Sequence, residues 1–266
     1  MIADAIVCNC TARILPHYAK EDITALADKE EDWTEEEIHT LYRQTGLGKI
    51  ALEAMRRQKI YENGEFVPLS KRLQPFQDAL FYEGEMEHEL LADVSKRDLM
   101  KDFLAPIADV MEPGDVFVNS STHTLGFRNG HAALVVDEFG TVLESLELGL
   151  DSALTANAHL WFAESSNFML LRLKNVDKAT RAKIAEEAQK NLLGVPYSLT
   201  VGIFSKKDQG TNLKSTHCSH LVWQAYKNAG FEIDSNGGMI VTPQDIARCD
   251  LFEVIQVYGF DPEDLW

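Results

Sequence analysis

Cys218 lies between two histidines in the stretch STHCSHLVWQAYKNAG, which covers residues 215–230. The residues that follow have the spacing of an amphipathic helix, in which one face carries Cys218, Leu221, Val222, Ala225 and Ala229. A thiol in the first turn of a helix meets unpaired N–H groups and the helix dipole, and both favour the nucleophilic thiolate. The position also suits a small side chain packed in a core, so this stretch alone predicts either a nucleophile or a core residue.

A nucleophilic cysteine needs a base within hydrogen-bond reach, and the two adjacent histidines are poor candidates for it. Thr216 is the expected cap of the helix. His217 and His220 then point about 100° or more away from Cys218, because successive helical residues are about 100° apart. Both are therefore predicted to be surface groups. A Cys-His-His metal site would need a fourth ligand that the local sequence does not supply, so no metal site and no cofactor are predicted.

His131 is a better candidate for the base, because it opens the apolar strand GHAALVV after an Asn-Gly turn. A histidine there is also typical of an ordinary polar strand end. If a two-residue turn closes the following hairpin, Ala133 pairs with Glu144, one diagonal step from His131. Such neighbours are about 7–8 Å apart at the backbone, within reach of a glutamate side chain. One more residue in the turn would bring Glu147 to the His131 face instead.

The elements that must position these residues follow residue 111. Apolar runs bounded by turn residues predict strands, and capped amphipathic runs predict helices. The strands are expected in residues 115–120, 130–136, 141–148, 167–175 and 251–259, and the helices in residues 177–194, 218–229 and 241–249. The pattern predicts an α+β fold in which an antiparallel sheet is packed by helices.

Residues 1–110 differ from the remainder because they have mainly helical patterns. Helices are expected in residues 32–48, 49–60, 83–94 and 95–111, with a hairpin around Asn63 and a strand in residues 4–14. Thr34 and Glu37 form a capping box, and Ser95 and Asp98 form a second capping pair. Pro106 should kink the last helix. We therefore predict a helix-rich region of unknown role in residues 1–110. Either it packs on the domain of residues 111–266 and narrows or covers its cleft, or it is an independent domain that binds a partner.

Composition excludes several classes of protein. The 266 residues include 25 basic and 42 acidic ones, so the net charge is −17, which disfavours binding to nucleic acid or anionic membranes. No apolar run approaches the roughly 18 residues of a membrane span. The N-terminus lacks the pattern of a secretion signal, which favours a cytoplasmic location, although export without a cleavable signal stays open. Four cysteines at uneven spacing do not predict a disulfide framework.

The region from Gly114 to about Gly259 resembles the permuted NlpC/P60 cysteine hydrolases, a papain-like group that includes YiiX/YebB-like proteins. The similar pieces occur in the order PGDVFV, GHAALVVDEFGTVLES, GVPYS, THCSHLVWQAYKNAG and TPQDIA. The histidine strand precedes the cysteine helix, which is the circularly permuted order. The resemblance covers a little over half of the chain and does not include residues 1–110.

The resemblance implies a role for each matching residue. Cys218 matches the nucleophile, His131 the base and Glu144 the polar third member of the triad. Tyr197 matches an aromatic position beside the nucleophile, although a core tyrosine is an equal alternative. His220 stands where the family often has glutamate, and that position is expected to help bind substrate.

The resemblance implies a thiol hydrolase, a cysteine peptidase or amidase that cleaves an amide bond in cell-wall-type peptides through an acyl-enzyme. One alternative is an acyltransferase or hydrolase acting on N-acyl or lipid substrates. Another is a non-catalytic binding module that keeps the fold. The expected partner is a small peptide or acyl-amide substrate, and the sequence does not predict an oligomeric state.

Overall fold

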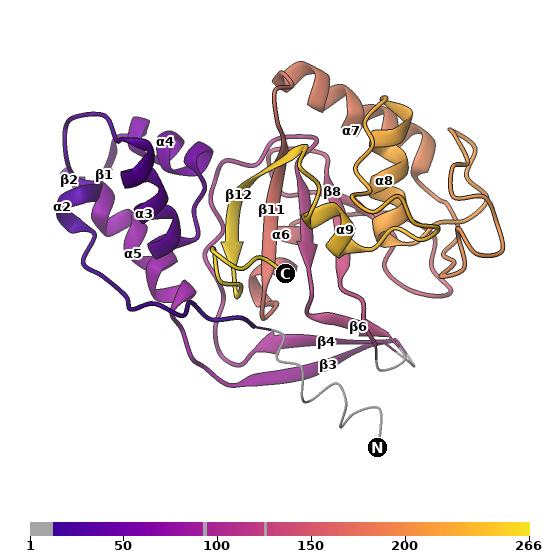
Figure 1. The fold of residues 1–266 in the computed structure, drawn as a ribbon, viewed down its shortest axis with the longest axis horizontal. Coiled ribbons are helices and arrows are strands. Elements are labelled where there is room, and N and C mark those ends of the chain that lie inside the picture. Colours follow the sequence, from indigo (N-terminus) through magenta and orange to yellow (C-terminus); the bar gives the residue numbers. More distant parts are fainter. Residues whose placement is uncertain (1–12, 93–94, 125–126) are drawn as a thin grey trace.

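The computed structural model describes residues 13–92, 95–124 and 127–266. A central β-sheet lies between two groups of helices (Figure 1). The helices of the N-terminal region cover one side of the sheet, and the long helices of the C-terminal half cover the other. The predicted strand in residues 4–14, with Cys8 and Cys10, lies almost entirely outside the described residues.

The central sheet has six strands, all paired antiparallel to their neighbours. They are β5 (Val116–Asn119), β8 (His131–Val135), β9 (Val142–Glu144), β10 (Ala153–Thr155), β11 (Phe168–Leu173) and β12 (Phe252–Tyr258). Their spatial order is β10-β9-β8-β5-β11-β12. The predicted α+β class with an antiparallel sheet is confirmed, and β10 is the strand of this sheet that the sequence patterns did not predict.

The N-terminal helices are short and follow one another closely. They are α2 (Thr24–Ala27), α3 (Glu35–Thr45), α4 (Lys49–Arg57) and α5 (Leu69–Leu80), with the predicted hairpin β1 (Ile60–Glu62) and β2 (Glu65–Val67) between α4 and α5. The capping box of α3 is confirmed: the Thr34 hydroxyl accepts from the N–H of Glu37, whose carboxylate accepts from the N–H of Thr34. The helix stops at Gly46, which has a φ of +70° that favours glycine.

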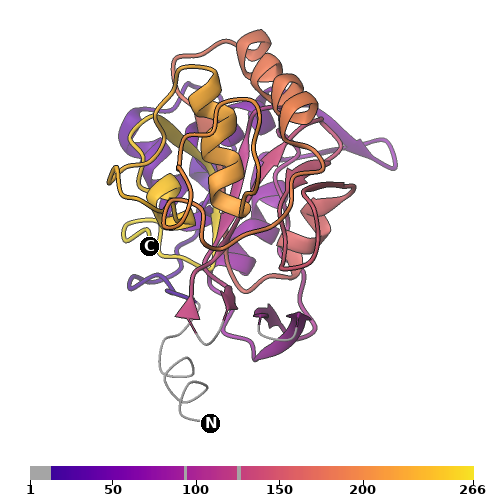
Figure 2. The same ribbon diagram turned by 90° about the vertical axis from the view of Figure 1, so that its right-hand side faces the viewer.

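The second group of helices comes from the C-terminal half of the chain. It consists of α7 (Lys178–Leu192), α8 (Cys218–Asn228) and α9 (Pro243–Ala247). Asp177 caps α7 and Thr242 caps α9, both as predicted. In Figure 2, α8 stands in front of the sheet and the N-terminal helices lie behind it. A further helix that the sequence patterns did not predict, α6 (Ala158–Glu164), packs on the N-terminal side.

The two sides of the sheet build two hydrophobic cores, because alternate strand residues point to opposite faces. Phe117 and Ala133 pack with the N-terminal helices and α6. Val118 and Leu134 pack with α7, α8 and α9. Burying one such large apolar side chain is worth roughly 1.5–3 kcal/mol, so each face contributes substantially to holding its helices in place. The N-terminal region thus packs on the rest of the chain, but on the side opposite α8.

Residues 86–92 and 95–100 form two paired strands where helices were predicted. Strand β3 (Met86–Ala92) pairs with β4 (Ser95–Met100), which pairs in turn with β6 (Thr122–Thr124) and through it with β7 (Phe127–Arg128). The predicted capping pair of Ser95 and Asp98 lies within β4, and Pro106 lies in irregular chain after it. Pairing with β6, which is distant in sequence, overrides the local helical preference.

Strand β4 also links the two predicted regions, because its partner β6 lies beyond residue 110. The four strands β3, β4, β6 and β7 form a small sheet at the lower edge of the molecule in Figure 1. In the described parts of the chain, no helix is long and apolar enough to cross a membrane.

Candidate active site

Cys218 is the first residue of α8. The helix packs against β8, with Leu221 and Val222 buried in the core beneath it. The N–H groups of the first turn have no carbonyl partner within the helix, and they face the side chain at its start. The positive end of the helix dipole lies at the same place, so this position favours a thiolate. The Cys218 side chain is nearly buried, with 8% of the residue exposed.

The β8–β9 hairpin has the predicted register. Leu134 pairs with Leu143, and the same register places Ala133 opposite Glu144. The turn itself occupies residues 137–140, which is two residues longer than the assumed turn. An even number of extra residues leaves the register and the side-chain faces unchanged, so Glu144 stays on the face of His131.

His131 and Glu144 are joined by a hydrogen bond. Nε2 of His131 lies 2.7 Å from Oε2 of Glu144, and both residues are buried. The second carboxylate oxygen of Glu144 accepts from the hydroxyl of Thr155 on β10. Because Nε2 faces Glu144, Nδ1 is the ring nitrogen left for the Cys218 thiol. Glu147, the alternative acid, lies half-buried, and its Oε2 has no hydrogen-bond partner in the part of the chain that the structure describes.

The sequence patterns did not predict the groups that hold His131 in place. The Trp161 ring of α6 meets the imidazole edge to face with centroids 5.1 Å apart, and the Phe162 ring lies 6.4 Å away. The Asn119 side chain accepts from the backbone N–H of His131 at 3.1 Å. Aromatic packing on one side and a carboxylate on the other restrict the ring to one orientation.

The charges of the site are coupled. Burial opposes a charged imidazole, but hydrogen bonding to Cys218 and Glu144 outweighs it and raises the pKa of His131 to about 9. Burial likewise opposes a thiolate, but interactions with His131 and then His217 hold the pKa of Cys218 well below its ordinary value. The arrangement therefore favours a thiolate–imidazolium pair at neutral pH.

His217 lies beside Cys218 and is buried, so its prediction as a surface group is wrong. It is the cap residue of α8, with the extended backbone angles φ −131° and ψ 173°. The angular spacing of helical residues does not apply to an extended residue, which is why the prediction failed. In the described part of the chain, its Nε2 is buried without a hydrogen-bond partner.

His220 is also buried, which corrects its prediction as a surface group. Its Nε2 lies 2.7 Å from the carbonyl oxygen of Lys207, which can only accept, so Nε2 carries the proton. Its Nδ1 then accepts from the hydroxyl of Thr216 at 2.9 Å, so Thr216 contacts His220 instead of capping the helix. Burial lowers the pKa of His220 to about 4, so the ring is neutral. Both nitrogens are engaged by protein groups, and His220 does not line the cavity beside Cys218.

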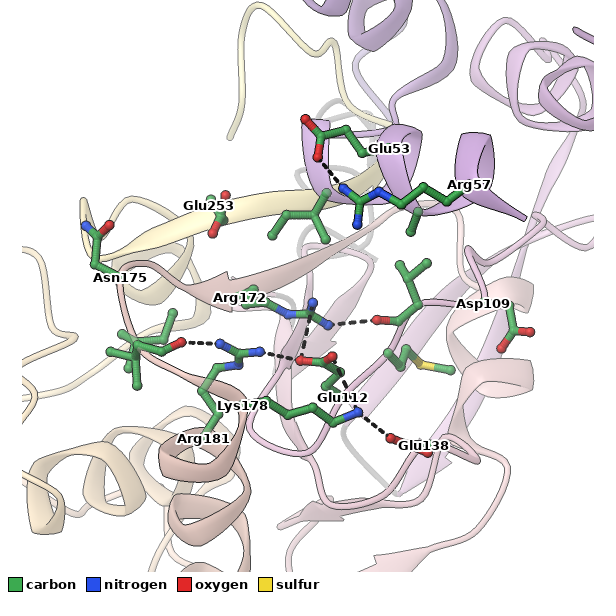
Figure 3. Close-up of a pocket in the computed structure, with 16 residues that line it drawn as sticks. Glu53, Arg57, Asp109, Glu112, Glu138, Arg172, Asn175, Lys178, Arg181 and Glu253 are labelled. Atoms are coloured by element: carbon green, nitrogen blue, oxygen red, sulfur yellow. Dashed lines mark hydrogen bonds and ion pairs between the residues drawn. The ribbon is translucent and has the colours of Figure 1, made fainter. Parts of the chain in front are cut away.

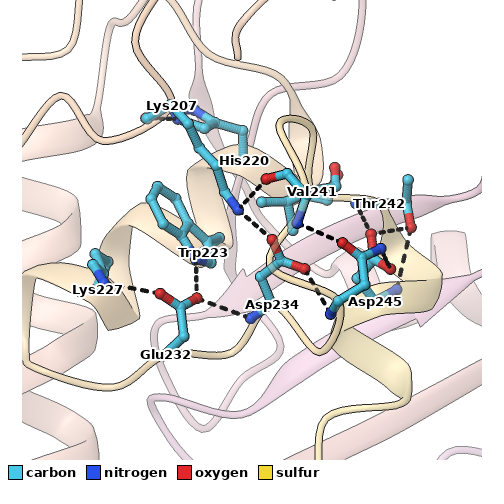
Figure 4. Close-up of polar contacts among 12 residues, drawn as sticks. Lys207, His220, Trp223, Lys227, Glu232, Asp234, Val241, Thr242 and Asp245 are labelled. Atoms are coloured by element: carbon cyan, nitrogen blue, oxygen red, sulfur yellow. Dashed lines mark hydrogen bonds and ion pairs between the residues drawn. The ribbon is translucent and has the colours of Figure 1, made fainter.

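A polar network fastens the loops around the start of α8 (Figure 4). Lys207, whose backbone carbonyl accepts from His220, forms an ion pair with the buried carboxylate of Asp234. Lys207 also lies over the Trp223 ring, 4.7 Å from its centroid. Ser219 donates to the carbonyl of Val241 at 2.8 Å. These contacts hold the two loops before and after α8 against the helix that carries Cys218.

A small cavity of about 80 Å³ opens beside Cys218. Its lining consists of Asn129, Tyr197, Leu199, His217, Cys218, Ser219, Ile240, Val241, Thr242 and Pro243. Tyr197 is brought there by a β-bridge between its backbone and Thr216. Burial and the nearby charge of Cys218 raise the pKa of Tyr197. The described lining contains no residue of 1–110, so the described part of the N-terminal region does not cover this cavity.

A larger cavity of about 710 Å³ lies elsewhere, between α4, the end of β11 and the start of α7 (Figure 3). Its basic groups are engaged by carboxylates: Arg172, Lys178 and Arg181 all form ion pairs with Glu112. Cys218 and His131 do not line it. The larger cavity is therefore separate from the candidate site at Cys218.

No protein-family model matches the sequence, and the search of curated proteins finds no match. Among solved structures, the chain is similar to yiiX from Escherichia coli O157:H7, which is described as a metalloprotein and as DUF1105. The two are 16% identical, and the match covers 54% of this chain and 96% of yiiX with a TM-score of 0.41. Similarity at this level does not indicate what the chain binds or which reaction it catalyses.

Proposed function

We propose that the chain is a cysteine hydrolase of the permuted papain-like type, in which Cys218 attacks an amide carbonyl and forms an acyl-enzyme. The observation that carries the proposal is a buried hydrogen bond between His131 and Glu144, on two strands that contact the helix beginning with Cys218. Cys218 begins α8, His131 begins β8, and Glu144 ends β9 with its carboxylate 2.7 Å from the imidazole. This is the set of nucleophile, base and orienting acid that acyl transfer requires.

The reaction follows from the charges of the site. The Cys218 thiolate attacks the carbonyl carbon, and N–H groups of the first turn of α8, including that of Cys218, bind the oxyanion. The His131 imidazolium then donates its proton to the leaving amine, which breaks the amide bond. Water, deprotonated by the now neutral His131, releases the acid from the sulfur. Glu144 holds the ring orientation and stabilises its charge throughout.

The cavity beside Cys218 restricts the acyl part of the substrate. A space of about 80 Å³ accommodates a group the size of a small side chain. Leu199, Ile240 and Pro243 make its wall partly apolar. The resemblance to the permuted NlpC/P60 hydrolases directs the proposal to peptides of the cell-wall type.

Alkylation tests the nucleophile directly. At mildly acidic pH an ordinary thiol with a pKa near 8.5 is almost fully protonated and reacts slowly. We expect iodoacetamide to label Cys218 in preference to Cys249, because burial raises the pKa of Cys249. Peptide mapping by mass spectrometry measures the modified fraction of all four cysteines. His131→Ala should remove the preference, while the distant His39→Ala should preserve it.

Acyl transfer separates a hydrolase from a binding module that has kept a reactive thiol. An activated ester such as p-nitrophenyl acetate should give a burst of one acyl group per chain on Cys218, followed by steady turnover. Cys218→Ser provides the matched control without the thiol. Equal alkylation of all cysteines at mildly acidic pH, or labelling of Cys218 without any acyl-enzyme or turnover, would count against the proposal.

A further inference from the structure

Three potential metal ligands meet on the small sheet formed by β3, β4, β6 and β7. They are His88 of β3, Asp98 of β4 and His123 of β6, and within the described residues their donor atoms all lie within 4.8 Å of one another. None of them takes part in the chemistry proposed for Cys218. They are separated by 10 and 25 positions in the sequence, which is why no ligand spacing is visible there.

Strand register explains why the three side chains share one face. His88 pairs directly with Asp98 across β3 and β4. His123 pairs with Lys96, and Lys96 is two residues from Asp98, so both point to the same side of β4. The backbone of Asp98 is held on both sides, by the carbonyl of Ser121 and the N–H of Ser166. The arrangement is therefore built into a paired strand and is not the product of a mobile loop.

The distances between the donor atoms of the three residues suit a tetrahedral metal ion once the His88 side chain moves outward. Zn²⁺ binds nitrogen and oxygen ligands at about 2.0–2.1 Å, so two ligand atoms on a tetrahedral site lie about 3.3 Å apart. Nε2 of His123 lies 3.4 Å from Oδ1 of Asp98. Nδ1 of His88 lies 2.7 Å from the same oxygen and would have to move outward. Its side chain is 47% exposed and has room to do so.

Each of the two buried residues, His123 and Asp98, has a donor atom available for a metal ion. His123 is 5% exposed, and in the described part of the chain its Nε2 has no hydrogen-bond partner. Asp98 is fully buried, and Arg128 forms an ion pair with its Oδ2, which leaves Oδ1 directed at the two histidines. An outer partner of this kind orients a ligating carboxylate.

The surrounding charge sets the expected strength of binding. Asp98 supplies one negative charge, whereas Arg128 and Lys96 place two positive charges on the same face. These cations disfavour a divalent ion and should weaken its binding relative to a site without them. Two imidazoles and one carboxylate favour Zn²⁺ and similar transition ions over Mg²⁺ or Ca²⁺, which prefer oxygen ligands.

We propose that His88, Asp98 and His123 form a binding site for a divalent transition-metal ion of the Zn²⁺ class, with a fourth position open to water. The ion would join β3, β4 and β6 and so stabilise the small sheet. The site is independent of the proposed Cys218 chemistry, and either can fail without the other.

Titration with ZnCl₂ by isothermal calorimetry, on the full chain with Cys218→Ala to remove the reactive thiolate, tests the site. We expect His88→Ala and His123→Ala each to weaken Zn²⁺ binding by at least about tenfold. The matched control is His39→Ala on the exposed surface of α3, which should leave binding unchanged. Loading with Co²⁺ gives a second readout, the visible absorption of a tetrahedral ion, which both ligand variants should lose.

Lys96→Met separates a metal site from an ion-pair cluster of protonated histidines around Asp98. Removing a like charge should tighten Zn²⁺ binding if the site is real. MgCl₂ should not compete. Absence of Zn²⁺ binding in the protein with intact ligands, or binding that is unchanged in both His88→Ala and His123→Ala, would overturn the proposal. Because His88 is half-exposed, its variant should fold even if changes at Asp98 do not.

Discussion

The hydrogen bond between His131 and Glu144 leaves one ring nitrogen for the chemistry proposed at Cys218. Glu144 occupies Nε2, so in the proposed reaction Nδ1 holds the proton that the leaving group needs. His217 adds a second imidazole beside the thiol, brought there by its extended backbone at the helix cap. The reactivity proposed for Cys218 thus depends on residues from α8, β8 and β9.

Exchanging Glu144 for glutamine tests whether the Glu144 charge supports His131 in the proposed reaction. Glu144→Gln keeps size and one hydrogen bond but removes the charge that supports the imidazolium, so we expect turnover to fall at least about 100-fold. Glu147→Gln is the matched control and should be nearly silent. Steady-state kinetics on a substrate with Cys218-dependent turnover, with circular dichroism to check folding, gives the comparison. If Glu147→Gln lost turnover while Glu144→Gln kept it, the acid would have been assigned to the wrong residue.

The pH dependence of the reaction should follow His131. Its pKa is raised from 6.5 to about 9, because hydrogen bonding to Cys218 and Glu144 outweighs burial. The imidazolium is therefore present below about pH 9 and lost above it, and kcat/KM should fall on the alkaline side near pH 9. The same raised pKa contributes stability that is full below about pH 6.5 and is lost as the pH rises through about 9.

The kinetic profile of Glu144→Gln supplies the control for this assignment. Glu144→Gln removes one of the two interactions that raise the pKa of His131. The alkaline fall of kcat/KM in this variant should therefore occur at lower pH. An alkaline limb near pH 6.5 in the unaltered protein would instead indicate an ordinary histidine and contradict the proposed ion pair.

At the scale of elements, a buried ion pair joins the neighbouring strands β5 and β11. Asp115, just before β5, is fully buried and accepts twice from the guanidinium of Arg172 on β11, at 2.8 and 2.6 Å. β5 pairs in turn with β8, which carries His131. The bidentate contact therefore holds the strand next to the one that positions the base.

Breaking this pair should be costly. Arg172→Met leaves the buried Asp115 carboxylate without its cation, and we expect a loss of about 3–5 kcal/mol in the free energy of unfolding. Asp115→Asn should cost less, because Arg172 keeps its ion pair with Glu112. Urea denaturation measures it, and the double variant should lose less than the sum of the two. The exposed pair of Lys178 and Glu138 is the matched control, and Glu138→Gln should change stability little. A small loss in the free energy of unfolding in both single variants would mean that water reaches the pair of Asp115 and Arg172.

At the scale of the whole molecule, the N-terminal helices and the sheet share one core. Phe117 and Leu170 from the sheet pack with Leu52 and Leu73 from the helices. The small sheet adds a second connection, because β4 pairs with β6 across residue 110. The N-terminal region therefore supports the sheet from behind, on the face opposite α8.

Removing residues 1–110 should expose this apolar face and destabilise the remainder. We expect the fragment of residues 111–266 to aggregate or to bind a hydrophobic dye, because the sheet loses the helices that cover it. Size-exclusion chromatography and thermal denaturation measure the outcome. A soluble, cooperatively unfolding fragment with a reactive Cys218 would show instead that residues 111–266 are an independent domain.

The sequence by itself determined the features that depend on local periodicity and capping. The strands β5, β8, β9, β11 and β12, the helix starting at Cys218, the Thr34 capping box and the hairpin register that puts Glu144 on the face of His131 all follow from neighbouring residues. Such features need few long-range contacts, because alternation, caps and turns set backbone angles and side-chain faces directly.

The tertiary structure alone decided the features that join distant segments. Strand β4 formed against its helical preference because β6 pairs with it. His217 came to lie beside Cys218 because the cap is extended, and His220 was buried because the loop of Lys207 folds over it. His88, Asp98 and His123 also come together only through strand pairing, and β6, which carries His123, is distant in sequence from β4. Contacts between residues far apart in sequence arise only from packing and strand pairing, and local patterns contain no information about which distant partner a strand or loop will meet.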